Sequence, residues 1–363
     1  MSELMTRREA LGLLGMTAAA AALPAASSAE GPTFPKGAII RTILKDYAPE
    51  ELAGGATLFH EHFQLAPDFN AKFGAATAAS RAANGLPPLP ARGGGPGRAG
   101  GLPPGPDIMH DVDLMTAEVK KAAMDGNLAC IVEAGHPEMG RDVNFVRQVA
   151  MKSGVPIVIG GGFYAQPWYP KEISTMSEDQ ILKALIKQVD DDVVGAFGEI
   201  GSWDEISKDE RKVFRAVGRA HVATNIPIFT HTGIPGKSAL EQLDIFEDAG
   251  VDPRHVVIGH LGNLVDSNVS VHKQICRRGA FVGFDRQGVN DTQQVPMVMA
   301  LIEAGFADHL MFSSDASSGY AKTITVFLPK LKAAGATDDV LHQIMVDNPR
   351  RFLAFVPKRP RKK

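Results

Sequence analysis

Cysteine and tryptophan are scarce in this sequence, since its 363 residues include only two of each. Two cysteines cannot build the framework of several disulfides that holds small secreted domains together. Cys130 lies in an apolar run and Cys276 in a helical pattern, so we expect both to be buried thiols.

Long apolar runs and an excess of one charge are also missing. No apolar run reaches the roughly 18 residues that a membrane-spanning helix needs. The 38 basic residues nearly balance the 41 acidic ones, which excludes the basic footprint of a nucleic-acid-binding protein. The basic run 357–363 is expected to be a solvated tail rather than a binding patch. We therefore expect neither a membrane span nor a nucleic-acid partner.

The first 29 residues resemble an export signal rather than part of a fold. Arg7 and Arg8 precede an Ala-rich apolar stretch, and Ser27, Ser28 and Ala29 are small residues suited to cleavage. A twin arginine before a weakly apolar stretch is typical of Tat signals. The alternative is a chance arginine pair before a short helix. We expect a periplasmic or otherwise exported protein whose folded part spans 30–356.

Short apolar runs alternate with amphipathic stretches through the rest of the chain. Eight runs are interpreted as strands, and they begin at Thr57, Leu128, Val155, Val193, Ile226, His255, Ala280 and His309. Nearly continuous apolar runs are typical of parallel strands that are buried on both faces. Helical patterns begin at Val112, Ser177, Ser207 and Ser238. This alternation predicts an α/β fold, a single-domain (β/α)8 TIM barrel.

The segment 84–106 interrupts this rhythm, because most of its residues are glycine or proline. Such a composition excludes a regular helix or strand. The segment follows the first strand and would lie on the catalytic face of a barrel. It is either a substrate-facing lid or a disordered insertion.

Side chains suited to metal binding end several of the predicted strands. In a barrel, the chemistry takes place at the C-terminal ends of the strands. His60 and His62 end the first strand and share one face of it, whereas Glu61 points the other way. Other strands end at Glu199, His231, His260 and Asp315. This set predicts a two-metal site, with Glu199 as the bridging ligand.

The other histidines fall outside this set. His255 and His309 begin strands and are expected at the opposite face, while His221, His272 and His342 lie in helical patterns. His110 and His136 lie in loops, and the sequence leaves their roles open.

The chain resembles the phosphotriesterase family of the amidohydrolase superfamily. The resemblance rests on TLFHEH, GRD (140–142), GGFYAQPWYP, GEIG, FTHTG, VVIGHLGN, VGFDRQG, FSSDAS and VDNPRRFLAF. These motifs occur in family order and cover about Leu58 to Phe355. The resemblance implies a metal-dependent hydrolase that holds two divalent ions, zinc first and manganese, cobalt or iron as alternatives.

The resemblance also assigns roles to individual residues. His60, His62 and Asp315 would bind the more buried ion, and His231 and His260 the more exposed one. Glu199 would replace the carbamylated lysine that bridges the ions in the best-known members. A hydroxide bridging the ions would attack the substrate, and Asp315 would accept its proton.

Departures from the phosphotriesterase pattern point to the substrate. Arg286 replaces a relay histidine, Asn263 replaces a relay aspartate, and Tyr164 replaces a pocket tryptophan. Arg286 and Tyr164 resemble lactonase-like members, so we interpret both as catalytic-pocket residues. The alternatives are that Arg286 only pairs with Asp285 and that Tyr164 is a rim aromatic whose hydroxyl meets water.

Two further pairs of residues in these motifs are interpreted structurally. Trp168 and Tyr169 can be packing residues of a loop. Arg141 and Asp142 are expected to form an ion pair at a helix start, where Asp142 would complement the helix dipole.

The resemblance therefore implies a hydrolase of lactones or carboxylic esters, with phosphotriester cleavage as a side activity, and a homodimer as the assembly. Two alternatives stay open. One is an amide-cleaving or deaminating amidohydrolase, and the other is an exported metal- or substrate-binding protein without turnover.

Overall fold

The computed structural model describes residues 31–88, 107–233, 238–264, 266–288 and 290–361. The expected signal at 1–29 and the part of the Gly/Pro-rich segment at 89–106 lie outside these residues. The chain divides into two units at Glu30, and only the second, Gly31–Lys363, is described below. None of the described helices is long and apolar enough to cross a membrane.

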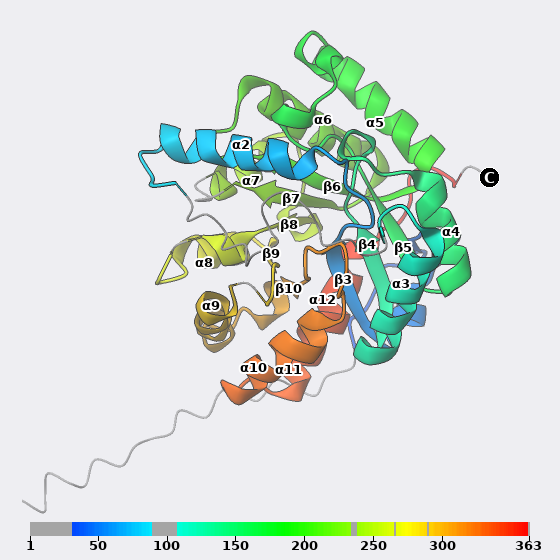
Figure 1. Cartoon of the computed structure of the whole chain (residues 1–363), viewed down its shortest axis with the longest axis vertical. Coiled ribbons are helices and arrows are strands. Elements are labelled where there is room, and N and C mark those ends of the chain that lie inside the picture. The colour runs from blue at the N-terminus through cyan, green and yellow to red at the C-terminus, as the bar shows by residue number, and fades with distance from the viewer. Residues whose placement is uncertain (1–30, 89–106, 234–237, 265, 289, 362–363) are drawn as a thin grey trace, which may run out of the picture. The chain divides into compact units, whose positions relative to one another are not determined.

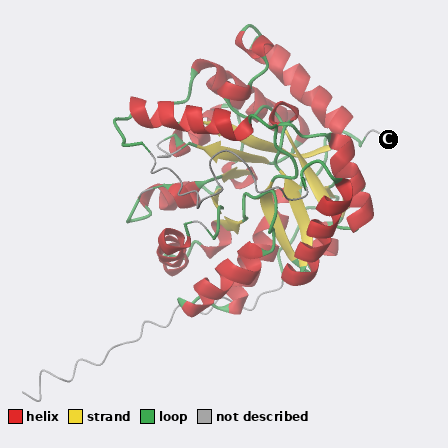
Figure 2. Ribbon diagram, viewed as in Figure 1, coloured by secondary structure: helices red, strands yellow, loops and turns green. Residues whose placement is uncertain are grey.

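Eight parallel strands surround the core, and each pairs with the next one along the chain. Figure 2 shows these strands enclosed by helices. The strands are β3 (Ala56–Glu61), β4 (Leu128–Glu133), β5 (Ile157–Gly161), β6 (Val194–Ser202), β7 (Ile228–Thr232), β8 (Val256–Ile258), β9 (Phe281–Phe284) and β10 (Leu310–Phe312). All eight coincide with the predicted apolar runs. A short antiparallel pair, β1 (Ile40–Arg41) and β2 (Asp46–Tyr47), precedes them.

Hydrogen bonds between the first strand and the segment after the last one bring the sheet round into a barrel. The His62 N–H donates to the Ala316 carbonyl at 2.9 Å, and the Asp315 N–H donates to the His60 carbonyl at 3.2 Å. The predicted (β/α)8 TIM barrel is therefore confirmed.

Helices between the strands and after the last strand cover the barrel (Figure 1). They are α3 (Val112–Gly126), α4 (Val143–Ser153), α5 (Glu178–Asp192), α6 (Lys208–Thr224), α7 (Ala239–Asp248), α8 (Ser270–Arg277), α9 (Asp291–Glu303), α10 (Leu328–Ala333), α11 (Asp338–His342) and α12 (Asn348–Leu353). Ser177 begins α5 with the predicted capping box, in which Ser177 and Gln180 bond each other's backbone N–H groups.

Helix α2 (Phe69–Ala83) was not predicted. It follows β3 and directly precedes the Gly/Pro-rich segment. Its large apolar residues are Phe69 and Phe73, one turn apart, and alanines occupy most of its other positions. The helix forms because alanine has the highest helix propensity, but the sequence carries no amphipathic stripe along its full length.

Both cysteines are free thiols in the buried interior, as predicted. Cys130 belongs to an apolar cluster with Phe59, Val132 and Phe229, and its side chain is fully buried. Cys276 packs in a second cluster that includes residues of the surrounding helices. Burial raises the pKa of each thiol to about 12, so both stay protonated.

The C-terminal basic run is exposed at residues 358–360, and it also contacts the barrel. Arg361 donates hydrogen bonds to the carbonyls of Thr42 and Ile43 at 2.9 and 2.8 Å. Arg359 forms an ion pair with Asp190 at 3.1 Å. These contacts fasten residues 358–361 to the surface near β1.

Candidate metal centre

All six predicted metal ligands meet at the C-terminal ends of the strands. They are His60, His62, Glu199, His231, His260 and Asp315. The histidines and the glutamate are at most 5% exposed, and the Asp315 side chain is 11% exposed. The fold therefore brings together, from five different strand ends, the residues that the sequence singled out.

The carboxylate of Glu199 lies in the middle of the four histidines. Its Oε2 is 2.9 Å from His231 Nδ1 and 3.3 Å from both His60 Nε2 and His260 Nε2. Its Oε1 is 3.4 Å from His62 Nε2. One carboxylate thus faces both pairs of histidines, the position that a bridging ligand requires.

Asp315 completes one side of the cluster. Its Oδ1 lies 3.2 Å from His62 Nε2 and 3.7 Å from His60 Nε2. The ligand atoms of His60, His62 and Asp315 are close enough to hold one ion, and so are those of His60, Glu199 and His260.

Unpaired nitrogen atoms in this cluster fit a metal ion. Among the described residues, neither ring nitrogen of His60 has a hydrogen-bond partner, and Nδ1 of His62 has none either. Buried polar atoms without partners are rare and call for an explanation. Neutral imidazole nitrogens next to carboxylates are the donors that Zn²⁺ and similar divalent ions prefer.

Electrostatics agree with this fit. Burial by itself would lower the pKa of His62, but Asp315 and Glu199 outweigh it and raise that pKa to about 9. Burial would raise the pKa of Glu199, yet the neighbouring His60 and His231 hold it well below its usual value. The carboxylates of Glu199 and Asp315 therefore favour positive charge beside them, and divalent ions would supply that charge.

Asp285, at the end of β9, orients His260. Its Oδ1 lies 2.7 Å from His260 Nδ1, and its Oδ2 accepts the backbone N–H of His260 at 3.1 Å. A carboxylate that accepts the second ring N–H of a metal-binding histidine fixes the tautomer and aims the other nitrogen. From the sequence we considered only a pairing of Asp285 with its neighbour Arg286, and we did not predict its contact with His260.

Arg286 pairs with Asp315, so the alternative pairing with Asp285 is wrong. Its Nε donates to Asp315 Oδ2 at 2.7 Å, and its side chain is 16% exposed. Asp285 is engaged by His260 instead. Asn263, at the other altered relay position, accepts a hydrogen bond from Asn290 Nδ2 at 2.7 Å.

Tyr164 lies inside the site and is 1% exposed, so it is not a rim residue. Its hydroxyl is 3.1 Å from His231 Nδ1, and the two rings meet at a right angle. Burial raises the pKa of Tyr164 well above 10, so the hydroxyl keeps its proton. It is placed to donate a hydrogen bond within the cluster.

Glu61 points away from its histidine neighbours, as expected, and holds the segment that carries Asp315. Its carboxylate accepts hydrogen bonds from the Ser313 hydroxyl, from the N–H and hydroxyl of Ser314, and from the Ala316 N–H, all between 2.6 and 3.0 Å. This network could not be predicted from the sequence, because its partners lie more than 250 residues away.

Three residues of the site have backbone angles in the left-handed region. The φ values are 60° for His260, 62° for Arg286 and 46° for Asp315. Residues other than glycine rarely adopt this conformation, and each instance costs on the order of 1–3 kcal/mol. Such strain is concentrated at functional sites, and here each residue follows the end of a neighbouring strand.

The GRD motif supports the barrel in a way that differs from our expectation. Asp142 caps α4 by accepting the Asn144 N–H at 2.8 Å, which agrees with its predicted place at the helix start. Arg141, however, pairs with Asp192 at 3.3 Å and with the Gly160 carbonyl, not with Asp142. The expected ion pair is wrong because Arg141 points toward the end of α5.

The remaining histidines separate into surface and buried positions. His136, left open by the sequence, is fully buried, and its Nε2 lies 2.9 Å from the Glu199 carbonyl. His110 is exposed and pairs with Asp107. His255 and His309 precede β8 and β10, at the opposite end of the barrel from the cluster.

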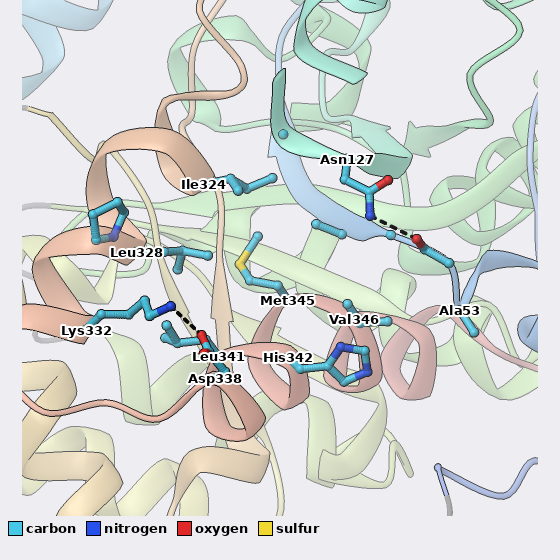
Figure 3. Close-up of a pocket in the computed structure, with 15 residues that line it drawn as sticks. Ala53, Asn127, Ile324, Leu328, Lys332, Asp338, Leu341, His342, Met345 and Val346 are labelled. Carbon is cyan, nitrogen blue, oxygen red and sulfur yellow. Dashed lines mark hydrogen bonds and ion pairs between the residues drawn. The ribbon is translucent and has the colours of Figure 1, made fainter. Parts of the chain in front are cut away.

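A pocket of about 440 Å³ lies at that opposite end, next to the start of β3. Figure 3 shows its lining, which includes Ile324, Leu328 and Met345 and the ion pair of Lys332 with Asp338. None of its lining residues belongs to the candidate metal centre. We therefore assign the chemistry to the cluster and not to this pocket.

Fold and site together define a TIM-barrel protein with a candidate metal cluster at the C-terminal ends of its strands. The model of the phosphotriesterase family matches residues 47–353. The chain therefore belongs to the phosphotriesterase family, and the resemblance inferred from the motifs is confirmed.

Two relatives illustrate the range of this family. An aryldialkylphosphatase of Saccharolobus solfataricus is 31% identical over 266 residues, which cover 65% of this chain and 84% of the relative. The human N-acetyltaurine hydrolase is 25% identical over 255 residues, which cover 62% of this chain and 73% of the relative.

Among solved structures, the lactonase Lmo2620 of Listeria monocytogenes superimposes with a TM-score of 0.70. It is 23% identical, and the match covers 87% of this chain and 98% of that structure. At this level of identity the comparison establishes the shared barrel fold.

Proposed function

We propose that the protein is a binuclear metal-dependent hydrolase that cleaves an ester bond, with a lactone or carboxylic ester as substrate and phosphotriesters as a side activity. The observation that carries the proposal is the central carboxylate of Glu199, whose oxygens lie within 3.4 Å of nitrogens of four histidines. Family membership supports hydrolysis, and the relative named aryldialkylphosphatase supports an ester substrate.

His60, His62 and Asp315 would hold one ion and His231 and His260 the other, with Glu199 shared between them. The ligand atoms of His60, His62 and Asp315 lie close enough to hold one ion, which supports the first set. The second set is supported by the 2.7 Å between His260 Nε2 and His231 Nδ1. The chemistry supplied by divalent ions held there would be a lowered pKa for a bound water molecule, to about 7, and polarisation of the substrate. Zinc fits these donors, and manganese, cobalt and iron are alternatives.

Three side chains of this protein would complete the reaction. Asp315 would accept the proton of the attacking water, and Arg286, at 2.7 Å, would orient that carboxylate. The protonated hydroxyl of Tyr164 would donate a hydrogen bond to the substrate oxygen beside His231. Arg286 and Tyr164 together are the reason for favouring a lactone.

The test is a comparison of kcat/KM for paraoxon and for a medium-chain lactone, with the purified chain reconstituted with Zn²⁺ or Mn²⁺ and the metal-free protein as blank. A lactone preference of several decades would support the proposal. A paraoxon preference would show that Arg286 and Tyr164 do not select lactones.

Amide hydrolysis is a second candidate, favoured by the relatives named N-acetyltaurine hydrolase. Adding N-acetyltaurine to the same assay separates the two reactions. Metal analysis adds an independent measurement, because a single-ion amidohydrolase would bind one equivalent rather than two. Binding of metal without turnover of any of these compounds would favour the exported binding protein.

We also propose that residues 1–29 direct export and that the protein forms a homodimer. Replacement of Arg7 and Arg8 by lysine should retain a Tat substrate in the cytoplasm. Fractionation of the producing cells tests export, and sedimentation of the purified chain tests the dimer.

A further inference from the structure

Helix α2 brings an aromatic ring to the candidate metal centre from outside the barrel strands. The ring centroid of Phe73 lies 6.0 Å from that of His231 and 5.5 Å from that of Trp203. The guanidinium carbon of Arg286 lies 5.7 Å from the Phe73 centroid. Phe73 is therefore next to two of the groups expected to handle the substrate.

The base of α2 fixes this placement. Phe69, one turn before Phe73, is buried, and its ring centroid lies 5.1 Å from that of Trp168. Trp168 in turn packs against Tyr164 at 4.8 Å. The face of α2 that carries both phenylalanines thus lies on the aromatic cluster of the site, while most of its alanines are exposed.

The far end of α2 is tied to the residue that follows Trp203. The Ser80 hydroxyl donates to Asp204 Oδ2 at 2.6 Å, and Asn84 Nδ2 lies 3.3 Å from the same oxygen. One short segment therefore presents Trp203 and also sets the position of the helix that presents Phe73. This contact ties the helix that carries Phe73 to the segment that carries Trp203.

Phe73 and Trp203 differ from the neighbouring aromatics in exposure. Tyr164 and Trp168 are buried, whereas Phe73 and Trp203 are both half-buried. Partly exposed aromatic faces beside a polar cluster gain free energy when an apolar ligand group covers them. Their place beside His231 puts such a group next to the bond to be hydrolysed.

We propose that Phe73 and Trp203 form a binding subsite for the alkyl chain of the substrate, and that Phe73 determines chain-length specificity. This inference rests on the proposed ester hydrolysis at the metal centre. It predicts a preference for long-chain over short-chain lactones that depends on a residue of α2.

The kinetic test compares γ-nonalactone with γ-butyrolactone. Phe73→Ala should lower kcat/KM about tenfold for γ-nonalactone and by less than about twofold for γ-butyrolactone, because only the longer chain reaches the subsite. Phe306→Ala is the matched control, since Phe306 is also half-buried and faces an arginine, Arg277, but lies at the opposite end of the barrel. Equal losses for both lactones would overturn the subsite.

A binding test does not depend on turnover. Both tryptophans of the chain, Trp168 and Trp203, lie within 6.4 Å of the Phe73 ring, so their fluorescence reports on this subsite. Titration with nonanoate should change the emission of the metal-loaded protein, and Phe73→Ala should raise the Kd about tenfold. An unchanged Kd would overturn the proposal.

The two tests separate the subsite from the reaction. Nonanoate binding that needs Phe73, in a protein that hydrolyses no lactone, would support the subsite and reject the proposed function. Lactone hydrolysis in which Phe73→Ala lowers kcat/KM by the same factor for both chain lengths would support the proposed function and reject the subsite. If thermal unfolding shows that Phe73→Ala is misfolded, Phe73→Leu keeps an apolar side chain, and its expected effect is a smaller change in the same direction.

Substitutions of Asp204 test whether its hydrogen bond with Ser80 positions Phe73 in the subsite. Asp204→Ala should raise KM for γ-nonalactone more than it lowers kcat, because α2 would no longer hold Phe73 beside Trp203. Asp204→Asn keeps an oxygen that can accept from Ser80 and should restore most of the wild-type KM. Failure of asparagine to restore KM would show that the Ser80 contact does not position Phe73.

Discussion

Arg286 Nε donates a 2.7 Å hydrogen bond to Asp315 Oδ2, which leaves the other carboxylate oxygen, Oδ1, facing His62 at 3.2 Å. Each oxygen of Asp315 thus has its own partner. The arginine also holds the pKa of Asp315 well below its usual value, against the effect of burial. The pair joins Arg286, which follows the end of β9, to Asp315, the proposed proton acceptor.

Asp315→Asn should remove most of the turnover while at least one metal ion stays bound. Asparagine keeps the shape and an oxygen toward His62 but cannot accept a proton, and general-base catalysis contributes about 10²–10⁴ in rate. Measurement of kcat together with metal content checks this. Wild-type turnover in Asp315→Asn would show that another group is the base.

Arg286→Lys should lower kcat by about tenfold or more and leave the metal content unchanged. An ammonium keeps the charge but does not reproduce the planar guanidinium that reaches Asp315, so the carboxylate loses its fixed orientation. The pH profile of kcat/KM is the second measurement. A purely structural role for Arg286 would leave that profile unmoved.

Glu61→Gln should destabilise the fold by about 1–3 kcal/mol, because the amide keeps one acceptor oxygen where the carboxylate serves several donors of 313–316. Activity should fall as well, since Asp315 belongs to the same segment. Denaturant unfolding measures the first effect. Glu118→Gln is a control, because Glu118 accepts a single N–H, that of Gly319, at the exposed surface. Similar losses in both variants would contradict the special role of Glu61.

His221 should make stability depend on pH at a place far from the metal centre. Burial lowers its pKa to about 4, and His255 and Lys358 add to this while Asp252 opposes it. The unfolded chain binds the proton near pH 6.5, so the free energy of unfolding should fall as the pH drops from about 6.5 to 4, by roughly 3 kcal/mol at most.

His221→Asn should flatten this pH dependence. An asparagine amide can replace the imidazole Nδ1, which lies 2.7 Å from the Ile226 carbonyl, without titrating. Urea unfolding at pH 7 and pH 5 in both proteins gives the comparison. An equal loss of stability in the variant would assign the pH dependence to other groups.

The strands, most helices and all six candidate ligands could be predicted because their signals are local. A parallel strand is a continuous apolar run, and barrel strands end at the catalytic face, so the position of His231 or His260 follows from the run before it. Ser177 with Gln180 likewise predicts the start of α5 over four residues.

The missed features depend on pairing between distant segments. Arg141 pairs with Asp192, and Glu61 binds residues 313–316. These partners lie far apart along the chain, so no local sequence pattern indicates the contacts. Helix α2 was missed because alanine gives it helix propensity without an amphipathic stripe. Its contacts with Trp168 and Asp204 appear only once the barrel has brought those residues together.

The rates at which the two buried thiols react with a labelling reagent would report how the protein unfolds. Only a thiolate attacks a disulfide reagent, and burial both raises the pKa of Cys130 and Cys276 to about 12 and keeps the reagent away from them while the barrel stays closed. Labelling at Cys130, inside the barrel, then follows the opening of the whole sheet. Labelling at Cys276 follows the release of α8 alone, so the two rates would separate global from local opening.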